Sequence, residues 1–177
     1  MMITYTKSTI VWSICATSGS NVSFAQLLDD ENLVLKQDDI NTQSYAWQSF
    51  EHPTNTLLPG MKLGLDRITR LSRNLISWKT ETDPSEGEYY LVNTDITLYL
   101  YSRSGNICCS AQWDGIDSRS KGLVYSKVND SQEVSFSFQA SEQPAIFVLS
   151  WLGKDKWLTW QSDSRQWDKV WEEPGDR

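Results

Sequence analysis

Among the residues of this 177-residue chain that could take part in catalysis, pairs of adjacent carboxylates are the most numerous. Asp29 with Asp30, and Glu172 with Glu173, are pairs of the kind that can flank a glycosidic bond as general acid and base. Neighbouring residues on a strand, however, point to opposite faces, so the two carboxylates of such a pair cannot act on one bond. We therefore interpret these pairs as solvated charge.

The single histidine and the three cysteines do not form a recognisable catalytic or metal site. His52 precedes a proline, and no nucleophile or orienting partner is evident beside it, so we predict a turn residue rather than a base. Cys108 and Cys109 are adjacent, which is neither the Cys-x-x-Cys spacing of zinc sites nor a favourable disulfide, and Cys15 leaves an odd count. We predict no catalytic residue, no metal and no cofactor.

Several functional classes are disfavoured by motifs and by charge. The sequence has no Gly-x-Ser-x-Gly elbow, no phosphate-cradling glycine loop, and neither the His-Arg-Asp nor the Asp-Phe-Gly set of protein kinases. A net charge of -7 without any basic block argues against nucleic acid. No run reaches the roughly 18 apolar residues of a membrane-spanning helix. The chain is thus predicted not to be an enzyme, not to bind nucleic acid and not to span a bilayer.

The elements that must position the side chains are predicted to be strands. Apolar and polar residues alternate at 96–101 and at 134–139, and this period of two places the apolar side chains on one face of a sheet. Turn markers such as Pro59 with Gly60, and Asp83 with Pro84, separate such segments. No stretch keeps a 3.6-residue period. The predicted fold class is therefore all-β.

Nine tryptophans in one chain of this length need a role. A tryptophan is either a large core anchor or, when exposed, a platform for stacking. We predict the core role for Trp12, Trp47, Trp78, Trp113, Trp160 and Trp171. Both roles stay open for Trp151, Trp157 and Trp167, because one face of each neighbouring strand is polar.

The longest distinctive motif is Trp-Gln-Ser-Phe-Glu-His-Pro-Thr-Asn-Thr-Leu-Leu-Pro-Gly-Met-Lys-Leu-Gly at 47–64. Ala-Gln-Leu-Leu-Asp precedes it at 25–29, and Ser-Trp-Lys-Thr at 77–80 and Gln-Trp-Asp-Gly at 112–115 follow. In this order the motifs resemble the extracellular region of plant S-receptor-like serine/threonine kinases and S-locus glycoproteins. In that family the 47–64 run closes a bulb-type lectin domain.

This resemblance implies a division into two lectin-like parts. Residues 1–60 correspond to the C-terminal part of a bulb-type, mannose-binding-like lectin domain. Residues 61–177 correspond to a second lectin-like unit with the S-locus glycoprotein signature, strongest at 109–177, and both parts are expected to be β-prism-like. Relative to the family, the signal peptide, the first lectin strands and the kinase domain are expected to be missing. We interpret the apolar segment after Lys7 as a strand rather than a signal peptide.

One motif bears on sugar binding. Bulb-type lectins carry Gln-x-Asp-x-Asn-x-Val-x-Tyr on a strand that presents its polar groups to mannose. Asp30, Asn32 and Val34 match that motif, but Leu28 replaces the Gln and Lys36 replaces the Tyr. Losing two hydrogen-bonding groups is expected to cost ~1 kcal/mol each, so we predict a degenerate carbohydrate-binding site. The alternative is that Asp30 and Asn32 form a structural turn or a polar sheet face.

The resemblance also implies a function. The family predicts an extracellular or plasma-membrane recognition module that binds a peptide or a mannose-type glycan, with a partner receptor, as in the recognition of pollen by S-locus relatives. The polar segment 118–132 is the predicted peptide contact. Asn21 and Asn129 begin Asn-x-Ser sequons and are candidate N-glycosylation sites. The alternative is a truncated product without independent ligand binding, because unpaired edge strands invite aggregation.

Overall fold

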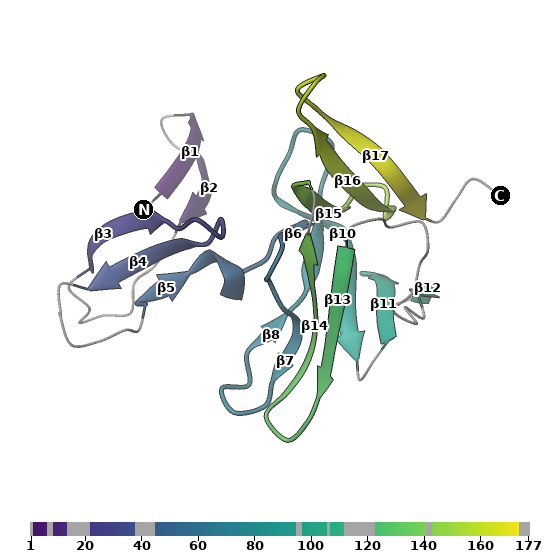
Figure 1. Cartoon of the computed structure of the whole chain (residues 1–177), viewed down its shortest axis with the longest axis horizontal. Helices are drawn as coiled ribbons and strands as arrows, with labels where there is room; N and C mark the ends of the chain where they lie inside the picture. The colour runs from purple at the N-terminus through teal and green to yellow at the C-terminus, as the bar shows by residue number, and fades with distance from the viewer. Residues whose placement is uncertain are drawn as a thin grey trace. The chain divides into compact units, whose positions relative to one another are not determined.

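A computed structural model of the whole chain describes residues 2–6, 9–13, 22–37, 45–94, 97–105, 107–111, 123–140 and 143–173 (Figure 1). The chain divides into two compact units, Met1–His52 and Pro53–Arg177. Within the described ranges nearly all regular structure is antiparallel strand, and the only helix is the 3-10 turn η1 (Ser49–Glu51). The predicted all-β fold class is therefore confirmed. None of the described helical structure is long and apolar enough to cross a membrane.

The N-terminal unit contains two small sheets. In the first, β1 (Met2–Thr6) pairs with β2 (Thr9–Ser13). In the second, β4 (Leu33–Gln37) lies between β3 (Val22–Leu27) and β5 (Trp47–Gln48). Successive side chains of a strand point to opposite faces, and both Val34 and Leu35 are buried, so β4 is covered on both faces.

The 3-10 turn follows β5 directly. It ends at His52, whose backbone N–H donates to the carbonyl of Ser49 at 3.0 Å. The imidazole of His52 stacks on Trp47, with ring centroids 5.3 Å apart and an interplanar angle of 3°. His52 is therefore a turn residue, as its sequence context predicted, and it packs against the residue that begins the 47–64 motif.

The C-terminal unit is built from three four-stranded antiparallel sheets. Their strand orders are β12-β11-β10-β9, β13-β14-β7-β8 and β17-β16-β15-β6. The strands are β6 (Thr56–Leu57), β7 (Leu63–Asp66), β8 (Ser72–Arg73), β9 (Leu75–Trp78), β10 (Glu86–Thr94), β11 (Thr97–Ser102), β12 (Ile107–Ala111), β13 (Leu123–Asn129), β14 (Glu133–Ala140), β15 (Ala145–Leu149), β16 (Asp155–Gln161) and β17 (Gln166–Glu173). Three sheets of equal strand number agree with the β-prism-like fold predicted for a lectin-like unit.

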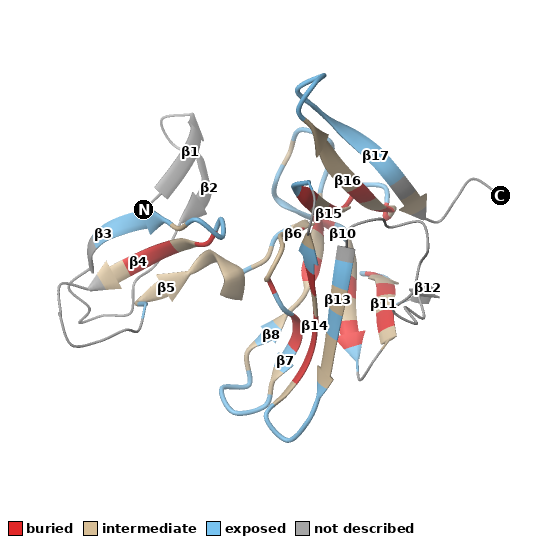
Figure 2. Cartoon of the chain, viewed as in Figure 1, coloured by how far each residue is buried: buried red, intermediate tan, exposed pale blue. Residues whose placement is uncertain are grey.

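All three sheets contribute side chains to one core. Figure 2 shows buried residues on β7, β11, β14, β15 and β16. At its centre the indole of Trp157, 3% exposed, meets Phe138 of β14 and Phe147 of β15 edge to face, at centroid distances of 4.7 and 5.0 Å. Such pairs add roughly 0.5–1.5 kcal/mol each to what area burial contributes. The aromatic cluster thus joins two of the three sheets.

The tryptophans differ from the prediction in an instructive way. Trp47, Trp78 and Trp160 are half-buried, so none of them lies in the fully buried core. Trp157, whose role was open, is the core residue. Trp160 lies near the end of the β16–β17 hairpin and packs edge to face on the exposed Trp167, at 5.5 Å. The side chains of Trp12, Trp113 and Trp171 lie outside the described residues.

The backbone conformation explains why two positions of the 47–64 motif are glycine. Gly60, at a φ of 82°, lies in a turn closed by the N–H of Met61 on the carbonyl of Leu58. Gly64 has a φ of 131°, and a Cβ there would lie 2.0 Å from the carbonyl oxygen of Val134 on β14. Only glycine tolerates such a backbone and such an approach, so this half of the motif is required by packing.

Candidate functional site

Asn32, a residue of the predicted sugar motif, lies just before β4 and is 4% exposed. Its side-chain N–H donates to Oε1 of Gln48 at 2.9 Å. Its Oδ1 accepts from the Ser49 hydroxyl at 3.1 Å and from the Phe50 backbone N–H at 3.2 Å. The amide of Asn32 therefore connects the beginning of β4 to β5 and η1.

Asp30 and Val34 lie on either side of Asn32 along the chain. Oδ1 of Asp30 accepts the backbone N–H of Asn32 at 3.1 Å, inside a turn in which Glu31 has a φ of 71°. Val34 is 0% exposed. The three residues thus make a turn, a cross-strand link and part of the core, and their role in sugar binding stays a prediction. Leu28 belongs to the same turn and donates its N–H to the Asn32 carbonyl at 2.9 Å.

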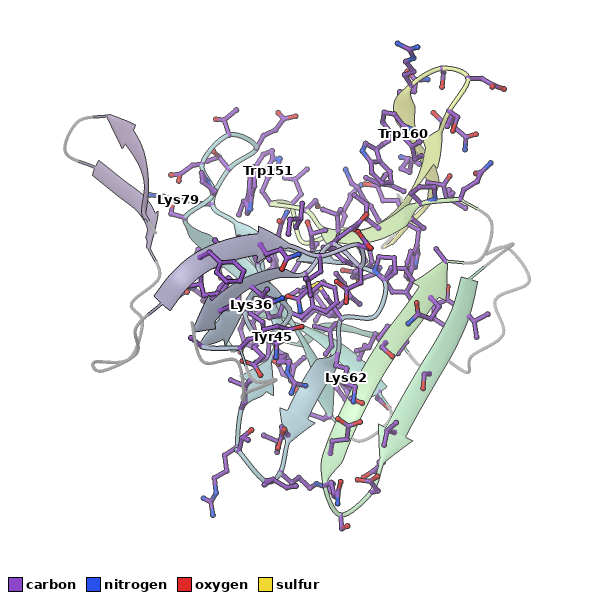
Figure 3. All side chains as sticks on the ribbon, turned by 60° about the vertical axis from the view of Figure 1, so that its left-hand side comes forward. Lys36, Tyr45, Lys62, Lys79, Trp151 and Trp160 are labelled. Atoms are coloured by element: carbon purple, nitrogen blue, oxygen red, sulfur yellow. The ribbon has the colours of Figure 1, made fainter. Side chains whose placement is uncertain are left out.

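An exposed cluster lies farther along the same sheet. Phe24 of β3 pairs with Lys36 of β4, and Gln26 pairs with Val34, so Phe24, Gln26 and Lys36 share one face. Nζ of Lys36 donates to Oε1 of Gln26 at 2.8 Å. It also lies 5.9 Å from the ring centroids of both Phe24 and Tyr45. Lys36 and Tyr45 are labelled in Figure 3. We call Phe24, Gln26, Lys36 and Tyr45 the Lys36 cluster.

Phe24 and Tyr45 of the Lys36 cluster are open to solvent, and the ammonium of Lys36 has no ion-pair partner among the described residues. Phe24 is 48% exposed and Tyr45 is 38% exposed. Among the described residues, no carboxylate lies within ion-pair distance of Lys36, whereas Lys62 is paired with Glu133 at 2.7 Å. The cluster therefore presents a cation between two aromatic faces.

Sequence reasoning missed the Lys36 cluster for a physical reason. The bulb-lectin motif marks Lys36 only as the loss of a tyrosine and does not include Phe24, Gln26 or Tyr45. The alternation of Phe24 and Gln26 is visible in the sequence, but the register that sets Phe24 opposite Lys36 is not. A hairpin pairing of 22–27 with 33–37 would have been the signal needed.

The sequon at Asn129 lies at the end of β13. Asn129 is exposed, and its Oδ1 accepts from Nη2 of Arg67 at 3.1 Å. In the following turn the backbone N–H groups of Glu133 and Gln132, at 2.8 and 2.7 Å, hold the pKa of the Asp130 carboxyl below its usual value. Of the segment 118–132, which was predicted as a loop contact, residues 123–129 form β13 and only 130–132 lie in this turn, so the loop prediction is wrong for 123–129. Asn21 lies outside the described residues.

The carboxylate of Glu172 is surrounded by lysines. Nζ of Lys169 lies 2.5 Å from its Oε2, and Nζ of Lys154 and Lys156 lie 3.8 and 3.7 Å from its Oε1. The hydrogen bond from Lys169 is the main cause that lowers the pKa of Glu172. Glu172 is thus an ion-paired residue of the β16–β17 hairpin rather than half of an acid–base pair.

The described residues contain no group of three or more His, Cys, Asp or Glu placed to hold a metal ion. Cys15 lies outside the described residues. Cys108 and Cys109 are placed in β12, but their side chains are not described.

Comparison with known proteins first gives the class of protein to which part of the chain is similar. Residues 1–79 match the family model of the D-mannose binding lectins. The N-terminal unit and the strands β6 to β9 that follow it thus have a lectin-like sequence on an all-β fold.

Longer relatives then extend the similarity over nearly the whole chain. It is 34% identical over 94% of its length to S-locus-specific glycoprotein BS29-2 of Brassica oleracea var. alboglabra. It is 32% identical over 97% of its length to receptor-like serine/threonine-protein kinase SD1-8 of Arabidopsis thaliana. It is 30% identical over 99% to G-type lectin S-receptor-like serine/threonine-protein kinase SRK of the same plant. The predicted resemblance to S-locus glycoproteins and G-type lectin S-receptor-like kinases is confirmed.

The chain spans only part of these relatives. It covers 42% of the S-locus-specific glycoprotein and 22% of each of the two kinases. The region matched to the lectin family model belongs to this shared part. The part that the chain shares with its relatives therefore includes the lectin-like segment 1–79.

Proposed function

We propose that this chain is an extracellular recognition module of an S-receptor-like kinase ectodomain and that it binds a glycan at the Lys36 cluster. One observation carries the proposal: the Lys36 cluster exposes two aromatic rings on a sheet face within the segment that matches D-mannose binding lectins. A plasma-membrane location agrees with the receptor-kinase names of the relatives.

The chemistry of the face supports a sugar ligand. An exposed aromatic ring offers an apolar surface on which the C–H groups of a sugar ring can stack, with little entropy lost by the rigid side chain. The amide of Gln26 and the ammonium of Lys36 lie on the same face and can bind hydroxyl or carboxylate oxygens. Mannose itself is a poor candidate, because Leu28 and Lys36 occupy two positions that carry polar partners for it in bulb-type lectins.

A glycan array tests this proposal. The intact chain, labelled at its amino terminus, is applied to neutral and acidic oligosaccharides, and circular dichroism verifies that the same sample is folded. We expect retention on a subset of the glycans that is reduced by Phe24→Ala. A folded sample that binds none of them would overturn the proposal and favour the alternative of a truncated product without a ligand.

A peptide ligand is the second candidate, and the β13–β14 turn is the observation that favours it. Asp130 caps this turn, and the guanidinium of Arg67 contacts both Asn129 and the carbonyl of Asp130. A polar turn held in this way can present side chains to a partner with little ordering cost. Exchanging residues 118–132 for those of a relative with a known peptide ligand is expected to transfer that specificity. Unchanged specificity in a folded exchange variant would exclude the turn.

A further inference from the structure

We propose that the Lys36 cluster is a binding site for an acidic sugar, with Lys36 taking the carboxylate of a hexuronate residue. The inference rests on the proposed glycan recognition and names the class of glycan. In this inference Lys36 is a ligand-binding residue, whereas the family motif marks it only as the loss of a mannose-binding tyrosine.

The geometry holds the ammonium in place at the surface. Lys36 and Phe24 are directly paired across β3 and β4, so their side chains leave the sheet side by side. Nζ donates to Gln26 at 2.8 Å and lies over the rings of Phe24 and Tyr45, 5.9 Å from each centroid, so the position of the charge is set by three neighbours. A flexible lysine is thus partly ordered before any ligand arrives, which reduces the entropy lost on binding.

The charge points to an anion. A lysine ammonium has three donors, and Gln26 takes one of them in the structure. Around it the described residues supply aromatic faces but no carboxylate, although the chain as a whole carries seven net negative charges. A ligand carboxylate would make a charge-assisted hydrogen bond there, which is stronger than the neutral bond a hexose hydroxyl would make.

The two rings point to a sugar rather than to an acidic peptide. A hexuronate joins a carboxylate to a rigid pyranose ring, so one residue can bring its charge to Lys36 and its C–H face to Phe24 or Tyr45. The acidic side chain of a peptide carries its carboxylate on a flexible apolar stem, and it would cover neither ring well while losing more rotamer entropy. Both Phe24 and Tyr45 are more than a third exposed as residues, which leaves the cluster accessible to a ligand.

The test titrates the whole chain with trigalacturonate and with its fully methyl-esterified form, which keeps the rings and hydroxyls but has no charge. We expect the acid to bind at least about tenfold more tightly than the ester. Lys36→Met is expected to remove that preference and Lys36→Arg to keep it. Lys79→Met is the matched control, since Lys79 is 66% exposed in the other unit and its loss changes the net charge equally.

Four results would overturn the inference. Equal binding of acid and ester, unaffected by Lys36→Met, would refute the uronate site and leave glycan recognition intact. If Lys36→Met and Lys79→Met lowered the preference for the acid equally, that preference would result from the overall charge of the chain rather than from Lys36. Binding of triglutamate as tight as that of trigalacturonate would assign the site to acidic peptides. Absence of binding to any glycan by a chain with the circular dichroism of the native fold would refute both this inference and the proposed function.

Discussion

The side-chain amide of Asn32 donates a hydrogen bond to the amide oxygen of Gln48, sixteen residues away, at 2.9 Å and so connects two sequence motifs. Asn32 belongs to the sugar-binding pattern at 28–36, which ends on β4, whereas Gln48 belongs to the 47–64 motif. Gln48 donates in turn to Oε1 of Glu51 at 3.0 Å. The two motifs thus meet in one hydrogen-bonded network that fixes β5 and η1 against the beginning of β4.

Removing the Asn32 side chain should therefore loosen the N-terminal unit. Asn32→Ala leaves the Ser49 hydroxyl, the Phe50 N–H and the Gln48 amide without their partner, at a cost of about 2–3 kcal/mol in the free energy of opening. Hydrogen exchange of the β4 backbone amides measures this change in the free energy of opening. Protection is expected to fall about thirtyfold or more in β4 and to remain unchanged in β14.

A double-mutant cycle separates the Asn32–Gln48 bond from the rest of the network. Asn32→Ala, Gln48→Ala and the double variant are compared by the same exchange measurement. We expect a coupling of about 1 kcal/mol, because the two side chains share a direct hydrogen bond. Strictly additive losses would show that the direct Asn32–Gln48 hydrogen bond contributes no coupling and that the motifs are connected through Ser49 and Phe50.

The second prediction concerns mannose. The unmodified chain is expected to pass through a mannose column without retention, because Leu28 and Lys36 lack the groups that bind mannose in bulb-type lectins. Leu28→Gln combined with Lys36→Tyr is expected to restore weak retention, at ~1 kcal/mol per recovered hydrogen bond. Retention of the unmodified chain that free mannose competes away would contradict the predicted degeneracy.

Alternation along strands was predictable from the sequence, and depth of burial was not. The period of two at 134–139 correctly placed Phe136 and Phe138 toward the core of the C-terminal unit, because it depends only on strand geometry. The same reasoning could not separate Trp157 from Trp160. Both lie on β16. Trp157 is paired with Phe147 of β15, whereas Trp160 is paired with Trp167 near the end of the β16–β17 hairpin.

The site residues show the same limit. Asp30 and Asn32 could be selected by their motif, and a structural turn was recognised as the alternative. Their partners could not be selected, because the hydrogen bonds of Asn32 end on residues sixteen to eighteen positions away. Pairing register likewise decides that Lys36 lies beside Phe24, and register follows from the folded sheet rather than from local pattern.

The third prediction uses the two kinds of tryptophan. Trp157→Ala empties the centre of the aromatic cluster with Phe138 and Phe147 and should lower the free energy of unfolding by about 3–5 kcal/mol. Trp167→Ala removes a side chain of the same size that is 42% exposed and should cost less than about 1 kcal/mol. Urea unfolding followed by circular dichroism compares them. Equal losses would place Trp157 outside the core.

The fourth prediction is a dependence on pH at the β13–β14 turn. The N–H groups of Glu133 and Gln132 lower the pKa of Asp130 from its usual 3.8, with a smaller contribution from Arg67. A lowered pKa in the folded state means that the charged form stabilises the fold. Its contribution is complete above the unfolded pKa and is lost as the pH falls through the lower folded pKa.

Asp130→Asn tests this sign, because asparagine retains an oxygen that can accept the same N–H groups without the charge. The variant is expected to unfold at a lower urea concentration than the parent chain at pH 7, and the difference should shrink as the pH is lowered below about 3.8. A difference that stayed constant with pH would assign the effect of Asp130 to shape rather than charge.

The last prediction is that Asn129 accepts an N-glycan when the chain is expressed through a eukaryotic secretory route behind an added signal peptide. Asn129 is exposed at the end of β13 and begins the Asn-Asp-Ser sequon, so its side chain is accessible to the transferase. Endoglycosidase treatment should reduce the mass of the secreted chain. Asn129→Gln and Ser131→Ala, each made together with Asn21→Gln so that the other sequon is absent, should remove that shift, and Ser131→Ala retains the side chain of Asn129 that accepts from Arg67. A mass shift that persists in both variants would assign the glycan to another position.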